Sequence, residues 1–194
     1  MDGSTTAPAP PKTRRFTVSE YHRMAEAGIL GEDDPVELIN GQIYVMTPIG
    51  SQHAACVDRL TRLFVLAFHD QATVRVQSPI LLGPDSEPEP DVSLLTPRDD
   101  AYAARHPRPE EVMLIVEVAG SSLAFDQNTK LPLYAQAGIP EVWIVALDED
   151  QIHIYRELTD SGYAAHTTHE RGDTITVQPL PDAETFAVKD ILGA

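Results

Sequence analysis

The chain has 194 residues, 42% of them hydrophobic, and a formal charge of −16 from 30 acidic and 14 basic residues. This length suffices for one buried core. The sequence has no run of about 18 apolar residues, which excludes a membrane-spanning helix, and it has no signal-peptide pattern. We therefore expect a cytoplasmic protein with no membrane contact. The acidic balance disfavours nucleic-acid binding through phosphate neutralisation, unless arginines or metal ions reverse the field locally.

The N-terminal third predicts a tail, a helix and a hairpin. Residues 1–13 are rich in proline and alanine, so we expect a disordered tail, with 14–194 forming a single domain. Thr17–Glu20 has capping-box spacing and begins a helix that we expect to end near Gly28. Asn40-Gly41 between two apolar runs, Val36–Ile39 and Gln42–Met46, predicts a β-hairpin with a type I′ turn.

The remaining elements predict a mixed α/β fold. Apolar residues recur at helical spacing from Ser51 to His69, a helix that includes the single cysteine, Cys56. A second helix is expected over 126–137, where Pro132 must lie in the first turns or kink it. Strands are expected at 73–82, 92–95, 112–118, 142–145 and 151–156, with weaker ones over 163–177. This order predicts a mixed sheet flanked by helices.

Glu117 and Asp91 are the candidate catalytic and metal-binding acids. Glu117 lies inside the apolar run Leu114–Val118, where a buried carboxylate needs a metal ion, a buried arginine or a raised pKa to compensate it. Asp91 follows Pro90 and directly precedes a strand, whereas Glu87 and Glu89 fit a solvated acidic turn. Two carboxylates from neighbouring strands suit Mg²⁺ or Mn²⁺. Lys130 either faces them, where it could stabilise charge on a phosphate, or is an ordinary surface lysine.

Several segments together resemble a known family. They are Glu37–Gly41, Glu87–Asp91, Ile115–Val118, Thr129–Leu131 with Tyr134-Ala135, and Ala137–Val145, and they span roughly residues 16–160. The set resembles the PD-(D/E)xK nuclease signature and, more specifically, the Uma-two family, a domain of unknown function that is expanded in cyanobacteria and is grouped with restriction endonucleases.

The resemblance implies a restriction-endonuclease-like core in which Asp91 and Glu117 bind the metal. The usual signature has a lysine two positions after the glutamate, but Ala119 stands there, and Lys130 on the next helix is the matching residue. Glu37 corresponds to an acid that such nucleases supply from an early element, and we expect it to be a catalytic residue that assists the metal directly or through water. His53 matches a family histidine, for which helix capping, support of a metal ligand and catalysis are all open.

The resemblance therefore implies an endonuclease that uses Mg²⁺ or Mn²⁺ to hydrolyse phosphodiester bonds, with DNA as the expected substrate and Arg59, Arg62 and Arg98 as candidate nucleic-acid contacts. A nuclease-fold protein that binds nucleic acid or a protein partner without cutting is the alternative, favoured if the rim of the site is acidic. A two-carboxylate sugar hydrolase fits less well. Because cutting two strands favours paired sites, we expect a homodimer, with Val36–Met46 or Val142–Val145 as candidate interface elements.

Overall fold

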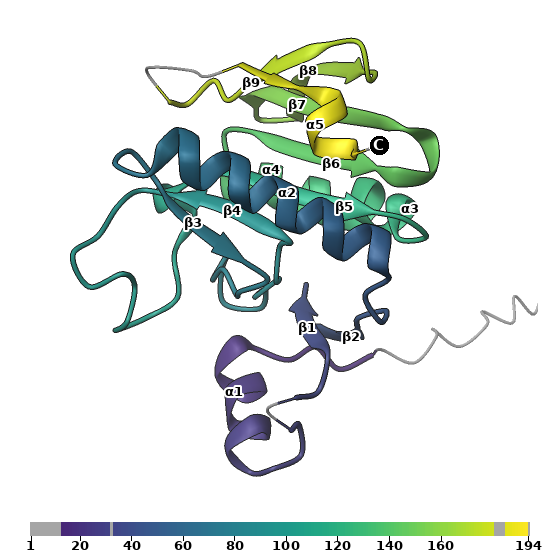
Figure 1. Cartoon of the computed structure of the whole chain (residues 1–194). Helices are drawn as coiled ribbons and strands as arrows, with labels where there is room; N and C mark the ends of the chain where they lie inside the picture. Colours follow the sequence, from purple (N-terminus) through teal and green to yellow (C-terminus); the bar gives the residue numbers. More distant parts are fainter. Residues whose placement is uncertain (1–12, 32, 181–184, 194) are drawn as a thin grey trace, which may run out of the picture.

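A six-stranded mixed sheet forms the centre of the computed structural model, which describes residues 13–31, 33–180 and 185–193 (Figure 1). The strand order is β3-β4-β5-β6-β7-β8, and only β5 and β6 run parallel. The bounds are β3 (Thr73–Val76), β4 (Val92–Leu95), β5 (Val112–Ala119), β6 (Val142–Ala146), β7 (Gln151–Thr159) and β8 (Gly162–His169). The mixed sheet flanked by helices, predicted from the order of elements, is confirmed.

One face of the sheet carries the larger apolar core. The amphipathic helix α2 (Ser51–Phe68) lies across this face, with the short helix α5 (Val188–Leu192) beside it (Figure 1). Phe64 of α2 meets Trp143 of β6 edge-on, with 5.8 Å between ring centroids. A small antiparallel pair, β9 (Thr174–Thr176) and β10 (Thr185–Ala187), completes this side. The predicted helix over 51–69 is therefore confirmed, and its apolar stripe is what fixes it to the sheet.

The opposite face is covered by the connection from β5 to β6. It consists of α3 (Leu123–Phe125), the π-helical turn η2 (Asp126–Lys130) and α4 (Leu131–Ala137), so the predicted helix begins slightly earlier than expected. The Leu131 N–H donates to the Asp126 carbonyl five residues back, and Pro132 has no N–H to donate to the turn. The wide turn therefore lies directly before the proline, and it carries residues of the site described below.

The N-terminal elements lie at one end of the sheet, below it in Figure 1. They are α1 (Val18–Glu26), which has the predicted capping box, and the hairpin of β1 (Val36–Ile39) and β2 (Gln42–Val45). Asn40 and Gly41 have φ angles of 49° and 73°, which confirms the type I′ turn. A bridge between Leu38 and Glu87 attaches the hairpin to the segment before β4. Single 3₁₀ turns occur at Pro109–Glu111 (η1) and Leu147–Glu149 (η3).

Three expectations about these elements need correction. The strand predicted over 73–82 ends at Val76, because Gln77 has a φ of 43° and Pro79 cannot donate a ladder hydrogen bond. Val142–Val145 cannot be an interface, since it is fully buried between β5 and β7. Glu87, expected in a solvated turn, is 4% exposed, because the hairpin bridge covers it and His22 contacts its carboxylate at 2.8 Å.

Two further observations concern the chain as a whole. The predicted tail lies almost entirely outside the described residues, which begin at Thr13. In the described parts of the chain, no helix combines the length and apolar character needed to cross a bilayer.

Candidate active site

Asp91 and Glu117 meet on neighbouring strands. In the antiparallel register of β4 and β5, Val92 pairs with Val116, so continuing by one residue places Asp91 opposite Glu117. Residues opposite each other in such a pair have Cβ atoms about 5 Å apart and project from the same face. The Val118 N–H also donates to Asp91 Oδ2 at 2.8 Å, which fixes the carboxylate beside β5. Strand register therefore brings the two predicted acids together.

Glu117 is held by residues of the crossover helix and the hairpin. Lys130 Nζ lies 3.3 Å from Glu117 Oε1 and 3.0 Å from Glu37 Oε2, and all three side chains are at most 7% exposed. The Tyr134 hydroxyl donates to the same Glu117 oxygen. Lys130 is thus no surface lysine: its ammonium joins the hairpin acid to the sheet acid, and Glu117 Oε2 has no hydrogen-bond partner among the described residues.

The helix places this network through its unusual turn. Asp126, Lys130 and Tyr134 are four residues apart, and all three are buried. Four residues of an α-helix turn by about 400°, so side chains four apart are offset by about 40° beyond one full turn. A π-helical turn rotates each residue by less than the ~100° of an α-turn, so the offset over Asp126–Lys130 has the opposite sign. One π-turn followed by one α-turn therefore keeps the three side chains nearly aligned on the face toward β5.

His53, at the start of α2, contacts Asp91. Its Nε2 lies 3.1 Å from Asp91 Oδ2, and Gln77 Nε2 lies 3.3 Å from Asp91 Oδ1. The hydrogen bond to Asp91 raises the pKa of His53 above its ordinary value, against the opposing effect of burial. Of the roles left open for His53, support of Asp91 is the one for which the structure supplies a contact.

These side chains line a cavity of about 940 Å³. Among the described residues, six carboxylates and one lysine line it, so it is strongly acidic. The acids are Glu37, Glu89, Asp91, Glu117, Asp126 and Asp148. The sequence analysis did not single out Glu89, Asp126 or Asp148 as cavity residues. The four-residue spacing of Asp126, Lys130 and Tyr134 was a signal for Asp126, whereas Glu89 lies in a segment that was expected to be a solvated turn.

Burial raises the pKa of three of these acids, Glu117, Asp126 and Glu89. It raises the pKa of Glu117 to about 8, with contributions from the nearby carboxylates and against the attraction of Lys130. Burial likewise raises the pKa of Asp126 to about 6, although Ser122 Oγ donates to its carboxylate at 2.8 Å. The pKa of Glu89 is raised by burial and by Glu37 and Glu87. One buried ammonium does not balance this cluster of carboxyl groups, which a divalent cation would.

The metal-free protein should therefore lose stability as pH rises from about 4.5 to about 8. In the folded state Glu117 keeps its proton up to about pH 8 and Asp126 up to about pH 6, whereas in the unfolded state they release it at their ordinary pKa values of 4.5 and 3.8. The folded state therefore binds more protons, and the free energy of unfolding falls as pH rises. We expect a loss of several kcal/mol, measured by urea unfolding in EDTA. Glu117→Gln should flatten the profile, and a stability that rises across the window would contradict the assigned directions.

The donor set fits a hard divalent cation. Carboxylate oxygens are the ligands that Mg²⁺ and Mn²⁺ prefer, and Glu117 Oε2 and Asp91 Oδ1 are the least engaged oxygens of the pair. Cys56 is buried in α2 and is not among the residues that line the cavity. Within the described ranges, no group of three or more His, Cys, Asp or Glu side chains is placed to hold a metal ion. The arrangement that fits is an ion bound by two carboxylates, with waters as its remaining ligands.

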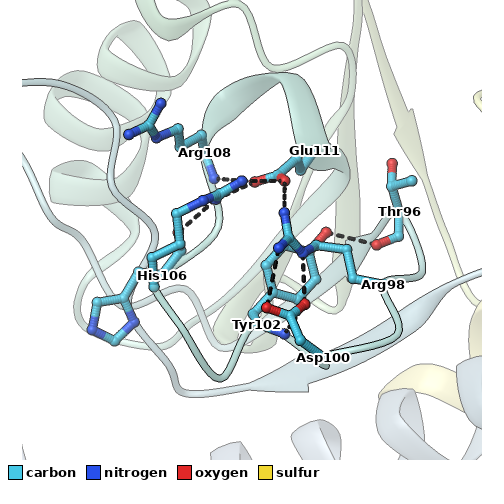
Figure 2. Close-up of polar contacts among 8 residues, drawn as sticks. Thr96, Arg98, Asp100, Tyr102, His106, Arg108 and Glu111 are labelled. Atoms are coloured by element: carbon cyan, nitrogen blue, oxygen red, sulfur yellow. Dashed lines mark hydrogen bonds and ion pairs between the residues drawn. The ribbon is translucent and has the colours of Figure 1, made fainter.

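The predicted arginine contacts lie elsewhere. Arg59 donates to the carbonyls of Ile191 and Leu192 at the end of α5, and Arg62 is exposed on α2. Figure 2 shows Arg98 between Asp100 and Glu111, with its guanidinium also 5.2 Å from the Tyr102 ring centroid. Considering only the described residues, no arginine lines the cavity. The structure thus brings together the acids, His53 and Lys130, but not these arginines.

Comparison with known proteins agrees with this architecture. Residues 18–189 match the family model Uma2, described as "Putative restriction endonuclease". Solved structures that resemble the chain include one from Anabaena variabilis, described as "a putative nuclease belonging to DUF820", with a TM-score of 0.73 and 17% identity, covering 91% of this chain and 97% of that one. At this identity, the likeness shows the fold alone. No curated protein matches. Because the Uma2 family model matches most of the length of this chain, the chain belongs to the Uma2 family.

Proposed function

We propose that this protein is a metal-dependent endonuclease that hydrolyses phosphodiester bonds in nucleic acid, with DNA as the substrate. The observation that carries the proposal is the in-register placement of Asp91 and Glu117, which face one cavity from adjacent strands. Family membership supports the same reaction class. In this proposal, Asp91 and Glu117 bind Mg²⁺ or Mn²⁺, which supplies positive charge against the charge that develops on the phosphate.

The other residues position this pair. Lys130 and Tyr134 hold Glu117 through Oε1, so Oε2 is the oxygen that would bind the ion. Glu37 keeps Lys130 in place and also accepts a hydrogen bond from the Glu89 N–H at 3.2 Å. His53 and the Val118 N–H orient Asp91 through Oδ2. Lys130 therefore acts on the reaction by lowering the pKa of Glu117 against the effect of burial and by orienting its carboxylate, with its direct contacts already made to two acids.

A protein with the nuclease fold that binds a partner without cutting is the second candidate. The acidic cavity, with no arginine among its described lining residues, is the observation that favours it. The two candidates differ in a direct assay. Incubating the protein with closed-circular and single-stranded DNA in Mg²⁺, Mn²⁺ or EDTA should give ion-dependent cleavage. Intact substrates under every condition would favour the binding protein.

We also propose that the protein is a homodimer, because two copies would present two sites to one nucleic acid. The exposed edge of the β1–β2 hairpin remains a candidate interface, since Val45 is 77% exposed. Light scattering on the purified protein measures this state directly. A monomer at assay concentrations would limit each encounter to one cut strand.

A further inference from the structure

The mouth of the acidic cavity is apolar and aromatic. Tyr44 of β2 and Phe125 of α3 both line it, with 4.9 Å between their ring centroids. Val45 and Ile49 also line the cavity and are 77% and 55% exposed, so this part of the lining reaches the surface. Among the lining residues, Glu37, Glu117 and Asp126 are buried, whereas Tyr44 and Phe125 are half-buried. The outer part of the lining therefore includes rings and aliphatic side chains, together with the exposed Asp148.

The aromatic pair is built into the same contact that forms the site. Tyr44 lies opposite Glu37 in the hairpin register, so both side chains project toward the crossover helix. There Glu37 meets Lys130 and Tyr44 meets Phe125. Phe125 directly precedes the π-helical turn that ends at Lys130, so one helical segment carries both the ring and the lysine. The hairpin thus presents an aromatic surface beside the carboxylates.

Charge disfavours a double helix at this mouth. Duplex DNA carries one negative charge per about 1.7 Å of its axis, whereas a single strand carries one per about 3.4 Å. In the part of the chain that the structure describes, six carboxylates line the cavity, and Lys130, the one lysine that lines it, is buried between Glu37 and Glu117. Arg98 and Arg105, which could contact phosphates, are paired with Glu111 and are not among the cavity-lining residues; Figure 2 shows the contact of Arg98. Phosphate neutralisation, on which duplex binding rests, is therefore poorly supplied here.

We infer that the mouth binds an unpaired nucleotide of a single-stranded segment, whose base stacks on the Tyr44–Phe125 pair. Stacking on aromatic side chains gives affinity without phosphate contacts and works for every base, because each base has a π-face. This inference deepens the proposed function, on which it rests. It names an unpaired strand as the substrate class and predicts that binding depends only weakly on salt, because few counterions are released.

The test compares two probes in fluorescence anisotropy. A short fluorescein-labelled single strand and its blunt duplex are titrated with the full chain, in calcium in place of magnesium. The single strand should bind about 10-fold more tightly or better, and Tyr44→Ala or Phe125→Ala should weaken it by about 10-fold. Tyr44→Phe should restore binding, since it keeps the ring. Leu66→Ala is the matched control, because Leu66 is 69% exposed on α2 and is not among the cavity-lining residues.

Equal affinity for both probes, or unchanged single-strand binding in Tyr44→Ala, would overturn the inference, as would no binding of either probe. Cleavage in Mg²⁺ separates it from the proposed function. Metal-dependent cleavage of duplex and single strand at equal rates would support the proposed nuclease and contradict the inference that its substrate is an unpaired strand. Single-strand binding through Tyr44 without any cutting would support the inference and contradict the nuclease.

Discussion

Replacing Lys130 with methionine should destabilise the protein by about 3 kcal/mol, because the change leaves two buried carboxylates without their cation. Lys130 lies within 3.3 Å of oxygens from both Glu37 and Glu117. Methionine has a similar length, so the expected loss comes from charge and not from a cavity. Urea unfolding at neutral pH measures the free energy of unfolding directly.

Two further variants separate this effect from a general loss of a lysine. Lys189→Met removes the same charge from an exposed position of α5 and should change stability by less than about 0.5 kcal/mol. Adding Glu117→Gln to Lys130→Met should recover part of the loss, because one uncompensated acid is then gone. A double variant whose loss equals the sum of the single losses would contradict the proposed contact between the two residues.

The second large effect concerns cleavage. Asp91→Asn should reduce the rate of metal-dependent cleavage by about 1,000-fold, equivalent to about 4 kcal/mol, while the fold is retained. Asparagine keeps the shape and an oxygen that can accept from the Val118 N–H, but it removes the negative charge opposite Glu117. Initial rates on a labelled oligonucleotide in saturating Mn²⁺ provide the measurement, with circular dichroism to check the fold.

Asp148→Asn is the matched control for this change. Asp148 lines the same cavity and is exposed, but it lies in the turn after β6 and not on the β4–β5 strand pair. Its removal should leave the rate within about 3-fold of the wild type, as expected for a substitution at an exposed side chain. If both variants lost activity equally, the general acidity of the cavity would matter, and the specific role of Asp91 would be wrong.

Local sequence patterns were sufficient for much of the fold. Asn40-Gly41 predicted the hairpin turn because few other pairs tolerate two positive φ angles, and both angles are positive. The apolar stripe of α2 and the apolar run around Glu117 predicted a surface-packed helix and a central strand. Strand order then determines that Asp91 and Glu117 face each other. These features depend on near neighbours or on a single register.

The contacts that organise the site depend on distant segments and could not be predicted in this way. The burial of Lys130 requires the hairpin and the crossover helix to meet, and no local pattern specifies that meeting. The burial of Glu87 under the hairpin could not be predicted from local patterns either. Nor could the ion pairs of Arg98 with Asp100 and Glu111. Composition identified an excess of acid, but only the fold shows that this acid surrounds the cavity.

The most direct test of metal binding by Asp91 and Glu117 is calorimetric titration of the wild type and of the double variant Asp91→Ala/Glu117→Ala with Mg²⁺ and Mn²⁺ at low ionic strength. Binding by the wild type that disappears in the double variant, with the fold retained, is the predicted result. This result would show that the ion binds at the β4–β5 pair and that the other acids of the cavity do not bind it without Asp91 and Glu117. No binding by the wild type, or equal binding by the variant, would contradict the metal site and favour a nuclease-fold protein in which Glu117 is a structural acid.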